Sequence, residues 1–426
     1  MSADGEGPAF YSGRVESLEW HIRPQRSDDV AAQACECQSV NASNPGSLGE
    51  LVRALNEARP FELADEVATY MRRTAQADRC TLLLADYAEK ALEPVPSRQD
   101  TEQFGEQPID GTPAGSAYTS GRLNVHKEGK KAVVFVPVTV RSERLGILAV
   151  RLPSPDAGTQ ATLGDVGLIV AYALVASRGY TDRFERIRRR RDLELAAEIQ
   201  WELLPVLAYD SPDFSIAGSL EPAYDIGGDT FDYAVAENTV TVGVTDAMGH
   251  GLKAALLSSL TVNTMRNCSR RGEDLVGQVS AAAEQVSGMF EEGYVSGFFF
   301  TVDPTTGKAL VVNAGHLPPL LLRDGVVSIL DVPPTTPLAM FTDTEYRAHP
   351  LTLEPGDRLL LHTDGITEAH QRGGAYFGDR KLADILIATR HSPAREVARL
   401  LTREVDQHMA GELRDDATAV CFDWRR

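Results

Sequence analysis

The chain has 426 residues, more than one ordinary domain holds, which indicates two or three domains, each large enough for its own core. Its 43% hydrophobic and 24% charged residues are typical of globular protein, and no apolar run reaches the ~18 residues that a membrane-spanning helix needs. The formal net charge of −19 argues against nucleic-acid binding, which requires basic surface to neutralise phosphates.

The N-terminus and the cysteines indicate the compartment. The first residues form neither a basic n-region nor an apolar h-region, so they do not resemble a signal peptide. Five cysteines are too few for a disulfide framework and favour a reducing environment. Cys35 and Cys37 form a CxC pair without a second pair nearby, which disfavours a zinc site. We therefore predict a cytoplasmic protein without a membrane partner.

In chain order, residues 1–46 are polar and lack periodicity, which predicts a mobile tail. Residues 47–180 show helical patterns from Ser47 and over Phe61–Ala75. Three apolar strands and a further helix follow, at Cys80–Ala85, Ala132–Val138, Leu145–Leu152 and from Ala161. This order is an α+β layout of the kind found in sensor domains.

Residues 47–180 resemble a GAF domain. The resemblance depends on the turn Ala114–Ala117, the strand Val136–Val138 and the segment Arg144–Val150. It implies a regulatory module that binds a small molecule or dimerises, although no cyclic-nucleotide signature is present. Cys80 is expected in the core of its strand, not as an attachment point for a chromophore or haem.

Residues 181–205 are predicted to form one amphipathic helix that links the domains and ends before Pro205. The arginines at 186 and 188–191 are accompanied by acidic residues, which favours a solvated helix face over a nucleic-acid patch. The apolar stripe of this helix has two alternative partners, the following domain or a second copy of itself in a homodimer.

Residues 206–426 are organised around the segment 239–251. Val240, Val242 and Val244 alternate with smaller or polar residues, as in a half-buried strand, and Asp246 falls at its end. Gly249 and Gly251 provide a turn into a helix whose predicted apolar face carries Leu252, Ala255, Leu256, Ser259 and Val262. Asp246 could hold a metal or act on a substrate, or it could cap the helix.

Four acidic motifs recur in this half of the chain, each at the end of an apolar run: Ile226–Asp232, Asp246–Gly251, Arg358–Gly365 and Arg414–Thr418. Such carboxylates suggest oxygen ligands converging on hard divalent cations, which suit phosphate chemistry. No nucleophilic serine triad, phosphate-binding P-loop or Cys-x5-Arg loop is present. The motifs therefore favour hydrolysis by metal-bound water.

Residues ~190–424 resemble the PPM-type metal-dependent serine/threonine protein phosphatases, in the bacterial sporulation and sigma-regulator branch. Seven motifs in family order carry the resemblance: Glu198–Pro205, Gly227–Asp229, Asp246–Gly251, Asn313–Pro319, Leu353–Asp357, Thr363–Glu368 and Asp415–Thr418. The resemblance implies an αββα sandwich with a pair of Mn2+ or Mg2+ ions between two sheets.

By motif, the resemblance implies that Asp246 bridges both ions and that the Ala247 carbonyl is a further ligand. Asp364 and Asp415 would hold one ion, and Asp229 would ligate directly or through water. Asp246 and Asp229 are thus the implied catalytic residues. Asp416 ranks below Asp415, and Asp232 is expected to orient what Asp229 holds.

Two histidines that follow glycines, His250 and His316, could donate a proton to the leaving oxygen or could shape turns. The latter is our preferred interpretation. The chain departs from the branch at Pro337-Leu338-Ala339, where Pro-Leu-Gly is common, and this affects only the expected loop geometry.

Two functions are compatible with these observations. In the first, the protein is a phosphatase regulated by the GAF-like domain, acting in trans on phosphoserine or phosphothreonine of an anti-sigma-factor antagonist. In the second, it is a catalytically inactive scaffold that binds phosphoprotein or senses a ligand. The presence of all four motif carboxylates favours the enzyme.

Overall fold

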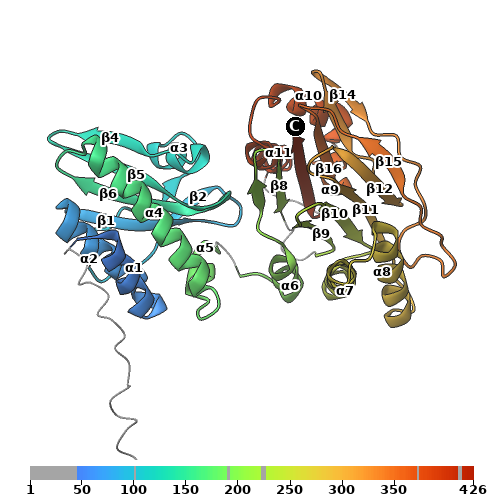
Figure 1. Cartoon of the computed structure of the whole chain (residues 1–426), viewed down its shortest axis with the longest axis horizontal. Helices are drawn as coiled ribbons and strands as arrows, with labels where there is room; N and C mark the ends of the chain where they lie inside the picture. Colours follow the sequence, from blue (N-terminus) through green and yellow to red (C-terminus); the bar gives the residue numbers. More distant parts are fainter. Residues whose placement is uncertain (1–45, 100–101, 190–191, 222–226, 372–373, 411–414) are drawn as a thin grey trace, which may run out of the picture.

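The computed structural model describes residues 46–99, 102–189, 192–221, 227–371, 374–410 and 415–426. Two bodies of secondary structure lie side by side, joined by a segment with two short helices (Figure 1). Residues 1–45 of the predicted tail lie outside the described residues, as do the Cys35–Cys37 pair, Ile226 and Arg414. Residue 46, the last of the predicted tail, is the first described residue.

The N-terminal body is built on a six-stranded antiparallel sheet in the order β3-β2-β1-β6-β5-β4. The strands are β1 (Arg79–Ala85), β2 (Ala91–Pro94), β3 (Gln107–Pro108), β4 (Asn124–Glu128), β5 (Lys131–Val140) and β6 (Glu143–Leu152). Helices α1 (Leu48–Glu57), α2 (Leu63–Ala75) and α4 (Ala157–Ser177) share one core with one face of the sheet. The predicted helices and the three predicted strands are confirmed, and Cys80 is buried in its strand.

The stretch expected as a turn at 114–117 is a helix, α3 (Pro113–Ser120), on the other face of the sheet. Thr112 caps it by accepting a hydrogen bond from the Gly115 amide at 2.9 Å, and Pro113 suits its first turn. A Cβ at Gly115 would lie 1.6 Å from the Ile109 carbonyl oxygen, so the helix approaches the preceding loop only because this residue is glycine. The architecture is α+β, and the resemblance to a GAF domain stays a prediction.

Helix α4 has a mean hydropathy of 1.4 over an 18-residue window and is, in the described residues, the one helix long and apolar enough to span a membrane by length and composition. This corrects the expectation that no segment reaches that length. One face of the helix, with Leu163, Val166 and Val170, packs in the core under the sheet. The core helix of a globular domain passes the same test, so the finding is weak evidence for a membrane span.

The connecting segment is not the single helix that the sequence predicts. It forms α5 (Arg183–Arg188) and α6 (Leu195–Leu203), and Arg189 between them is extended. The extended backbone lets the Arg189 guanidinium pair with Glu198 at 2.5 Å, nine residues on, which a continuous helix would not allow. The prediction of a solvated arginine face is also wrong for Arg188 and Arg189, whose side chains are only 14% and 25% exposed.

The C-terminal body is a sandwich of two antiparallel sheets. The first, in the order β15-β12-β11-β10-β9, contains β9 (Asp229–Val235), β10 (Val240–Ala247), β11 (Val295–Val302), β12 (Lys308–Ala314) and β15 (His349–Thr352). The second, in the order β14-β13-β16-β17-β8-β7, contains β7 (Ala208–Asp210), β8 (Phe214–Glu221), β13 (Leu320–Arg323), β14 (Val326–Ile329), β16 (Arg358–His362) and β17 (Ala417–Trp424).

Apolar side chains of the two sheets meet in one core, to which Val240, Val242 and Val244 contribute from β10. Helices α7 (Leu252–Arg270) and α8 (Leu275–Met289) cover the first sheet, and α10 (Gly378–Ala388) and α11 (Ala394–His408) cover the second. These four layers agree with the predicted αββα arrangement (Figure 1). Along β10, Val240, Val242 and Val244 are buried while Thr241 and Gly243 are partly exposed, which confirms the predicted half-buried strand.

The predicted face of α7 is confirmed in part, since Ala255 and Val262 are buried. Leu252 and Leu256 are 46% and 43% exposed, while Ala254, Leu257 and Ser258 are buried. The Ser258 hydroxyl donates a hydrogen bond to the Gly228 carbonyl, so small and polar residues face the sheet where the helix comes closest to it. The prediction of a buried position is therefore wrong for Leu252 and Leu256.

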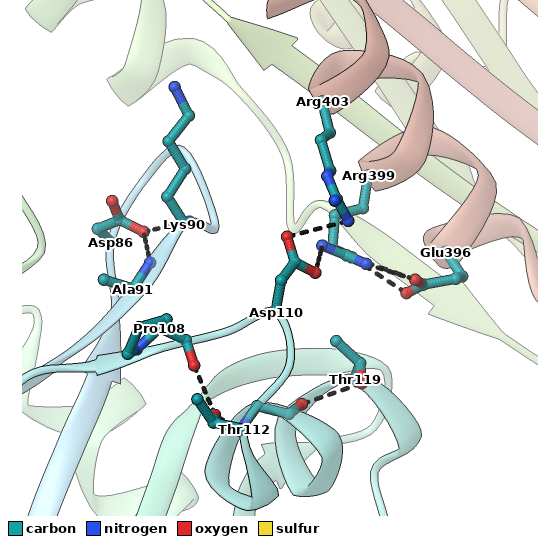
Figure 2. A network of polar contacts seen from close by, with 11 residues as sticks. Asp86, Lys90, Ala91, Pro108, Asp110, Thr112, Thr119, Glu396, Arg399 and Arg403 are labelled. Atoms are coloured by element: carbon teal, nitrogen blue, oxygen red, sulfur yellow. Dashed lines mark hydrogen bonds and ion pairs between the residues drawn. The ribbon is translucent and has the colours of Figure 1, made fainter. Parts of the chain in front are cut away.

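Charged side chains join the two bodies. The Arg395 guanidinium of α11 pairs with Glu89 at 2.5 Å, and Lys90 lies 3.0 Å from Asp406. Figure 2 shows Asp110 of the N-terminal body between Arg399 and Arg403 of α11, at 3.3 Å and 3.0 Å. Helix α11 thus provides the C-terminal partner in each of these ion pairs.

Candidate active site

Adjacent strands bring the first two predicted acids together. Asp229 begins β9 and Asp246 lies near the end of β10, and the two residues are paired in the antiparallel register. Asp246 belongs to the strand, whereas the N-cap position of α7 is occupied by Gly251, which provides no side-chain cap. The helix-capping explanation of Asp246 is therefore wrong.

The other two motifs meet at the neighbouring ends of β16 and β17. Asp364 starts the short helix α9 (Asp364–Thr367), directly after β16, and Asp415 precedes β17. A Cβ at Gly365 would lie 1.9 Å from the Asp416 carbonyl oxygen, so glycine is required for these two segments to touch. This contact explains why a glycine follows Asp364.

Asp416 is 1% exposed and holds backbone in place. Its Oδ2 accepts hydrogen bonds from the Gln200 side chain at 2.7 Å and from the amides of Gly228 and Asp229 at 2.9 Å and 3.3 Å. Gln200 also donates to the Asp229 carbonyl at 2.5 Å. With three donors on one oxygen, Asp416 holds backbone in place, whereas Asp415 is exposed. The ranking of Asp415 above Asp416 as a metal ligand stays a prediction.

Gln200 and Thr363 were not among the predicted site residues. The Thr363 hydroxyl donates to Asp229 Oδ2, and Gln200 links α6 to both Asp229 and Asp416. Both lie in motifs that carry the phosphatase resemblance, Glu198–Pro205 and Thr363–Glu368. Their presence in those motifs was the available signal, but their partners are distant in sequence.

The carboxylates form one electrostatic site. Burial raises the pKa of Asp246 to about 7, and repulsion from Asp364, Asp415 and Asp416 adds to this effect. Burial, followed by repulsion from Asp246 and Asp416, holds the pKa of Asp229 well above its usual range. Burial likewise raises the pKa of Asp416 to about 6. None of the interactions that shift the pKa of Asp246 comes from a cation.

Hard divalent cations such as Mg2+ and Mn2+ prefer oxygen ligands. These clustered carboxylates, whose charge the protein does not neutralise, are therefore suitable ligands for such cations. The Ala247 carbonyl lies at the same place, because a Cβ at Gly228 would be 2.9 Å from its oxygen. However, no group of three or more acidic, histidine or cysteine side chains in the described part of the chain is arranged so that it could hold an ion as it stands. The donor chemistry fits, and a bound ion would have to draw the carboxylates together.

The two histidines differ in exposure. His316 is 7% exposed, its Nδ1 lies 2.8 Å from the Ser296 hydroxyl and its Nε2 lies 3.2 Å from the His362 carbonyl oxygen. Burial lowers the pKa of His316 to about 3, so the ring is neutral and suits a structural position. His250 is exposed in the turn formed by Gly249 and Gly251. Burial, followed by repulsion from Asp364, raises the pKa of Asp415, and His250 opposes this shift.

Asp232 does not orient Asp229. Its carboxylate forms two hydrogen bonds of 2.9 Å with the Arg266 guanidinium of α7, which also donates to the Leu203 carbonyl at 2.8 Å. Because Asp232 is three residues after Asp229 on one strand, the two side chains point to opposite faces of the sheet. The expected role of Asp232 is thus wrong, and the residue links β9, α7 and the end of α6.

The departure at Pro337-Leu338-Ala339 has a local consequence. Ala339 has a φ of 64°, the left-handed conformation that glycine adopts without strain. Leu338 nevertheless forms hydrogen bonds with Val295 in both directions, at 3.1 Å and 2.8 Å. The loop therefore keeps its connection to β11 in spite of the alanine.

Comparison with known proteins identifies this domain. Residues 236–425 match the family model described as Stage II sporulation protein E (SpoIIE). The C-terminal domain is therefore similar to the SpoIIE family over these residues. The chain is also 25% identical over 265 residues to Protein IcfG of Synechocystis sp., covering 54% of this chain and 41% of that protein. It is 25% identical over 191 residues to Phosphoserine phosphatase RsbP of Bacillus subtilis, covering 43% and 47%.

The chain thus spans less than half the length of these two curated relatives. Among solved structures, it is similar to the SiaA-PP2C domain of Pseudomonas aeruginosa, with a TM-score of 0.46 and 23% sequence identity. The match covers 54% of this chain and 94% of that domain.

Proposed function

We propose that the protein removes phosphate from phosphoserine or phosphothreonine of a partner protein, in a reaction that depends on two Mn2+ or Mg2+ ions. The observation that carries the proposal is the convergence of Asp246, Asp364 and Asp415 without a protein cation to neutralise Asp246. The SpoIIE match and the similarity to a phosphoserine phosphatase support the same reaction.

In this proposal, Asp246 bridges the two ions, the Ala247 carbonyl is a further ligand, and Asp364 and Asp415 hold one ion. Asp229 ligates directly or through water. Divalent cations bound there would polarise a phosphoryl oxygen and lower the pKa of a bound water.

Other residues of the site hold these groups in position. Asp416 and Gln200 fix the Gly228–Asp229 backbone, and Thr363 fixes the Asp229 carboxylate. His250 is the exposed one of the two histidines and could give a proton to the leaving oxygen.

The proposed substrate is a separate protein in the cytoplasm, a phosphorylated anti-sigma-factor antagonist. This part of the proposal is based on the resemblance to the sigma-regulator branch. We further propose that the N-terminal domain, as a GAF-like module, regulates the site through α6. Gln200 of this helix contacts Asp229 and Asp416, and its last residue, Leu203, accepts a hydrogen bond from Arg266 of α7. A shift of α6 would therefore disturb the backbone that carries Asp229.

The test is phosphate release from a phosphoserine peptide and from phosphorylated antagonist proteins, with and without Mn2+. Asp246→Asn removes the charge at the bridging position, and a loss of ~4 kcal/mol of transition-state stabilisation lowers turnover roughly a thousandfold. The fold should survive because Asn keeps the shape of Asp246 within β10. Asp331→Asn, at an exposed position, is the matched control.

Circular dichroism of both variants reports the fold. Wild-type turnover in Asp246→Asn would overturn the metal assignment. Binding of phosphorylated peptide without phosphate release by the wild-type protein, under all metal conditions, would instead establish the inactive scaffold.

A further inference from the structure

A cavity of about 300 Å3 lies where the N-terminal domain, the connecting segment and α11 meet. Its lining includes Arg144 of β6, Arg188 and Arg189 of the connecting segment, Trp201 of α6 and Arg395 of α11. This volume is at the lower end of the range for small-molecule sites, ~300–1,000 Å3. Five arginines contribute to the lining, in a chain whose net charge is −19.

Most of these arginines have a carboxylate partner. Arg178 pairs with Glu143 at 2.6 Å, Arg189 with Glu198 at 2.5 Å and Arg395 with Glu89 at 2.5 Å. Arg188 lies 3.5 Å from Glu185, which Arg178 also contacts at 3.3 Å. The remaining carboxylate of the lining, Glu202, is exposed and pairs with none of them in the described residues.

Arg144 is the exception. Its guanidinium has no hydrogen bond or ion pair within the described residues, and its NH1 is buried without a partner. Burial, followed by repulsion from Arg395, lowers the pKa of Arg144. Glu89 and Glu396 act on Arg144 only at a distance, and they are already paired with Arg395 and Arg399. The guanidinium groups of Arg144 and Arg395 thus depend on the same counter-charge, the Glu89 carboxylate.

Two further buried donors belong to the same lining. The Nε atoms of Arg189 and Arg395 have no acceptor in the part of the chain that the structure describes. A water molecule could accept a hydrogen bond from such an N–H group. Water does not, however, compensate the unpaired positive charge of Arg144, and burying a charge without a counter-charge is costly. An anion would satisfy both the donors and the charge.

We propose that this cavity binds a small organic anion through a phosphate or carboxylate group held by Arg144. A guanidinium binds either group through two parallel N–H···O bonds. The half-buried Trp201 ring, which lies 4.3 Å from the Tyr87 ring, offers a flat surface beside the charge for the rest of the ligand.

The lining comes from both domains, so an occupied cavity favours their docked arrangement. Trp201 is next to Gln200, whose side chain holds Asp229 and Asp416, so the ligand acts on the segment that contacts the acidic site. The site itself does not depend on the proposed phosphatase activity, because binding requires neither metal nor turnover.

The experiment measures the thermal midpoint of the full chain after metal removal on a chelating resin, with no soluble chelator present. Inorganic phosphate and succinate are the two probes, and chloride at equal ionic strength is the reference. We expect at least one probe to raise the midpoint of the wild-type protein above that in chloride. Phosphate alone would identify a phosphate ligand, and succinate a carboxylate ligand. No rise with either probe would overturn the site.

Arg144→Gln tests the residue, and Arg122→Gln, at an exposed position of the same domain, is the matched control. We expect Arg144→Gln to lower the apparent affinity for the effective probe at least tenfold and the control to keep it. In chloride alone, Arg144→Gln should melt at the wild-type temperature or above, because it removes an unpaired, partly buried charge. A lower midpoint there, or equal losses in both variants, would show that Arg144 is not a ligand-binding residue. Arg144→Lys, which keeps the charge but not the paired donors, should also bind the probe more weakly.

Discussion

At the scale of single residues, two adjacent acids show how far a motif can predict a role. Asp415 and Asp416 are equivalent in composition, yet Asp415 is exposed beside His250, whereas Asp416 is buried under Gln200 and the Gly228 amide. The sequence ranked Asp415 above Asp416 as a ligand through family resemblance alone. The hydrogen bonds that explain the difference join residues 188 and 216 positions apart, so no local pattern could have shown them.

Glu221 gives a prediction for pH dependence. Burial raises its pKa to about 7 from the ordinary value of 4.5, with Asp406 and Asp86 adding to the effect and Lys90, 3.9 Å away, opposing it. Between these two values the folded protein holds a proton that the unfolded chain has lost, so stability falls as pH rises and the whole penalty is present above about pH 7. Glu221→Gln should therefore raise the free energy of unfolding at about pH 8 by one to a few kcal/mol, and change it little near pH 4.

Urea unfolding at both pH values measures this difference. The control is Glu345→Gln, because the Glu345 side chain is 83% exposed. This variant should change the free energy of unfolding only slightly, and by the same amount at pH 4 and pH 8. A Glu221→Gln effect of the same size at both pH values would contradict the explanation.

At the scale of elements, the turn after β16 is set by one glycine. A side chain at Gly365 would overlap the Asp416 carbonyl, so Gly365→Ala should separate the β16 and β17 ends that carry Asp364 and Asp415. We expect a loss of about 1–3 kcal/mol of stability from overpacking, together with weaker Mn2+ binding. Gly288→Ala, in α8 with no atom within 4 Å of its Cβ, should be neutral or stabilising by up to about 1 kcal/mol. Chemical denaturation and Mn2+ titration distinguish the two variants, and equal behaviour would rule out this role of the turn.

Helix α6 supports the site through Gln200, which suggests a second test at this scale. Gln200→Ala removes the side-chain donor to the Asp229 carbonyl and one of the three donors to Asp416 Oδ2, which costs about 1–3 kcal/mol. The Gly228–Asp229 backbone should then be less fixed, so Mn2+-dependent phosphate release should fall at least tenfold. The control is Gln407→Ala on the exposed face of α11. Unchanged turnover in Gln200→Ala would show that α6 is a spacer and not part of the site's support.

The same scale shows what periodicity predicts. Alternation correctly located β10, and apolar runs located β1, β5 and β6. The sequence did not predict the break between α5 and α6, because the break depends on the ion pair between Arg189 and Glu198. Local helix propensity carries no information about this pair. Ala254 and Ser258 of α7 were missed because their burial follows from close approach to Gly228, where small and polar residues fit.

At the scale of the whole molecule, the interface between the domains is ionic. Lys90, Asp110 and Glu89 of the N-terminal domain all have charged partners in the C-terminal domain (Figure 2 shows those of Asp110). In the sequence these residues lie in polar loops and on a helix with no distinguishing pattern. Their pairing follows from the docking of two separate folds, and a single chain's periodicity carries no information about that docking.

Glu89 is the central anion of this interface. It accepts hydrogen bonds from Tyr118 at 2.8 Å and from Arg395 at 2.5 Å, and Arg144 also lies within its field. Glu89→Gln would leave the buried Arg395 without its counter-charge, and breaking a buried pair in this way costs ~3–5 kcal/mol. Because Arg395 belongs to the other domain and can regain water when the domains part, we expect most of this cost to appear as weaker docking.

The Glu89→Gln protein should therefore have a larger radius of gyration by small-angle scattering, and trypsin should cleave its connecting segment faster than that of the wild type. Glu354→Gln is the control, since its pair with Arg323 joins two segments of the C-terminal domain and its side chain is 58% exposed. Each domain should keep its own unfolding transition, because Glu89 does not belong to either hydrophobic core of the N-terminal domain. Wild-type scattering and wild-type cleavage rates in Glu89→Gln would mean that the apolar contacts of the connecting segment, and not this ion pair, hold the domains together.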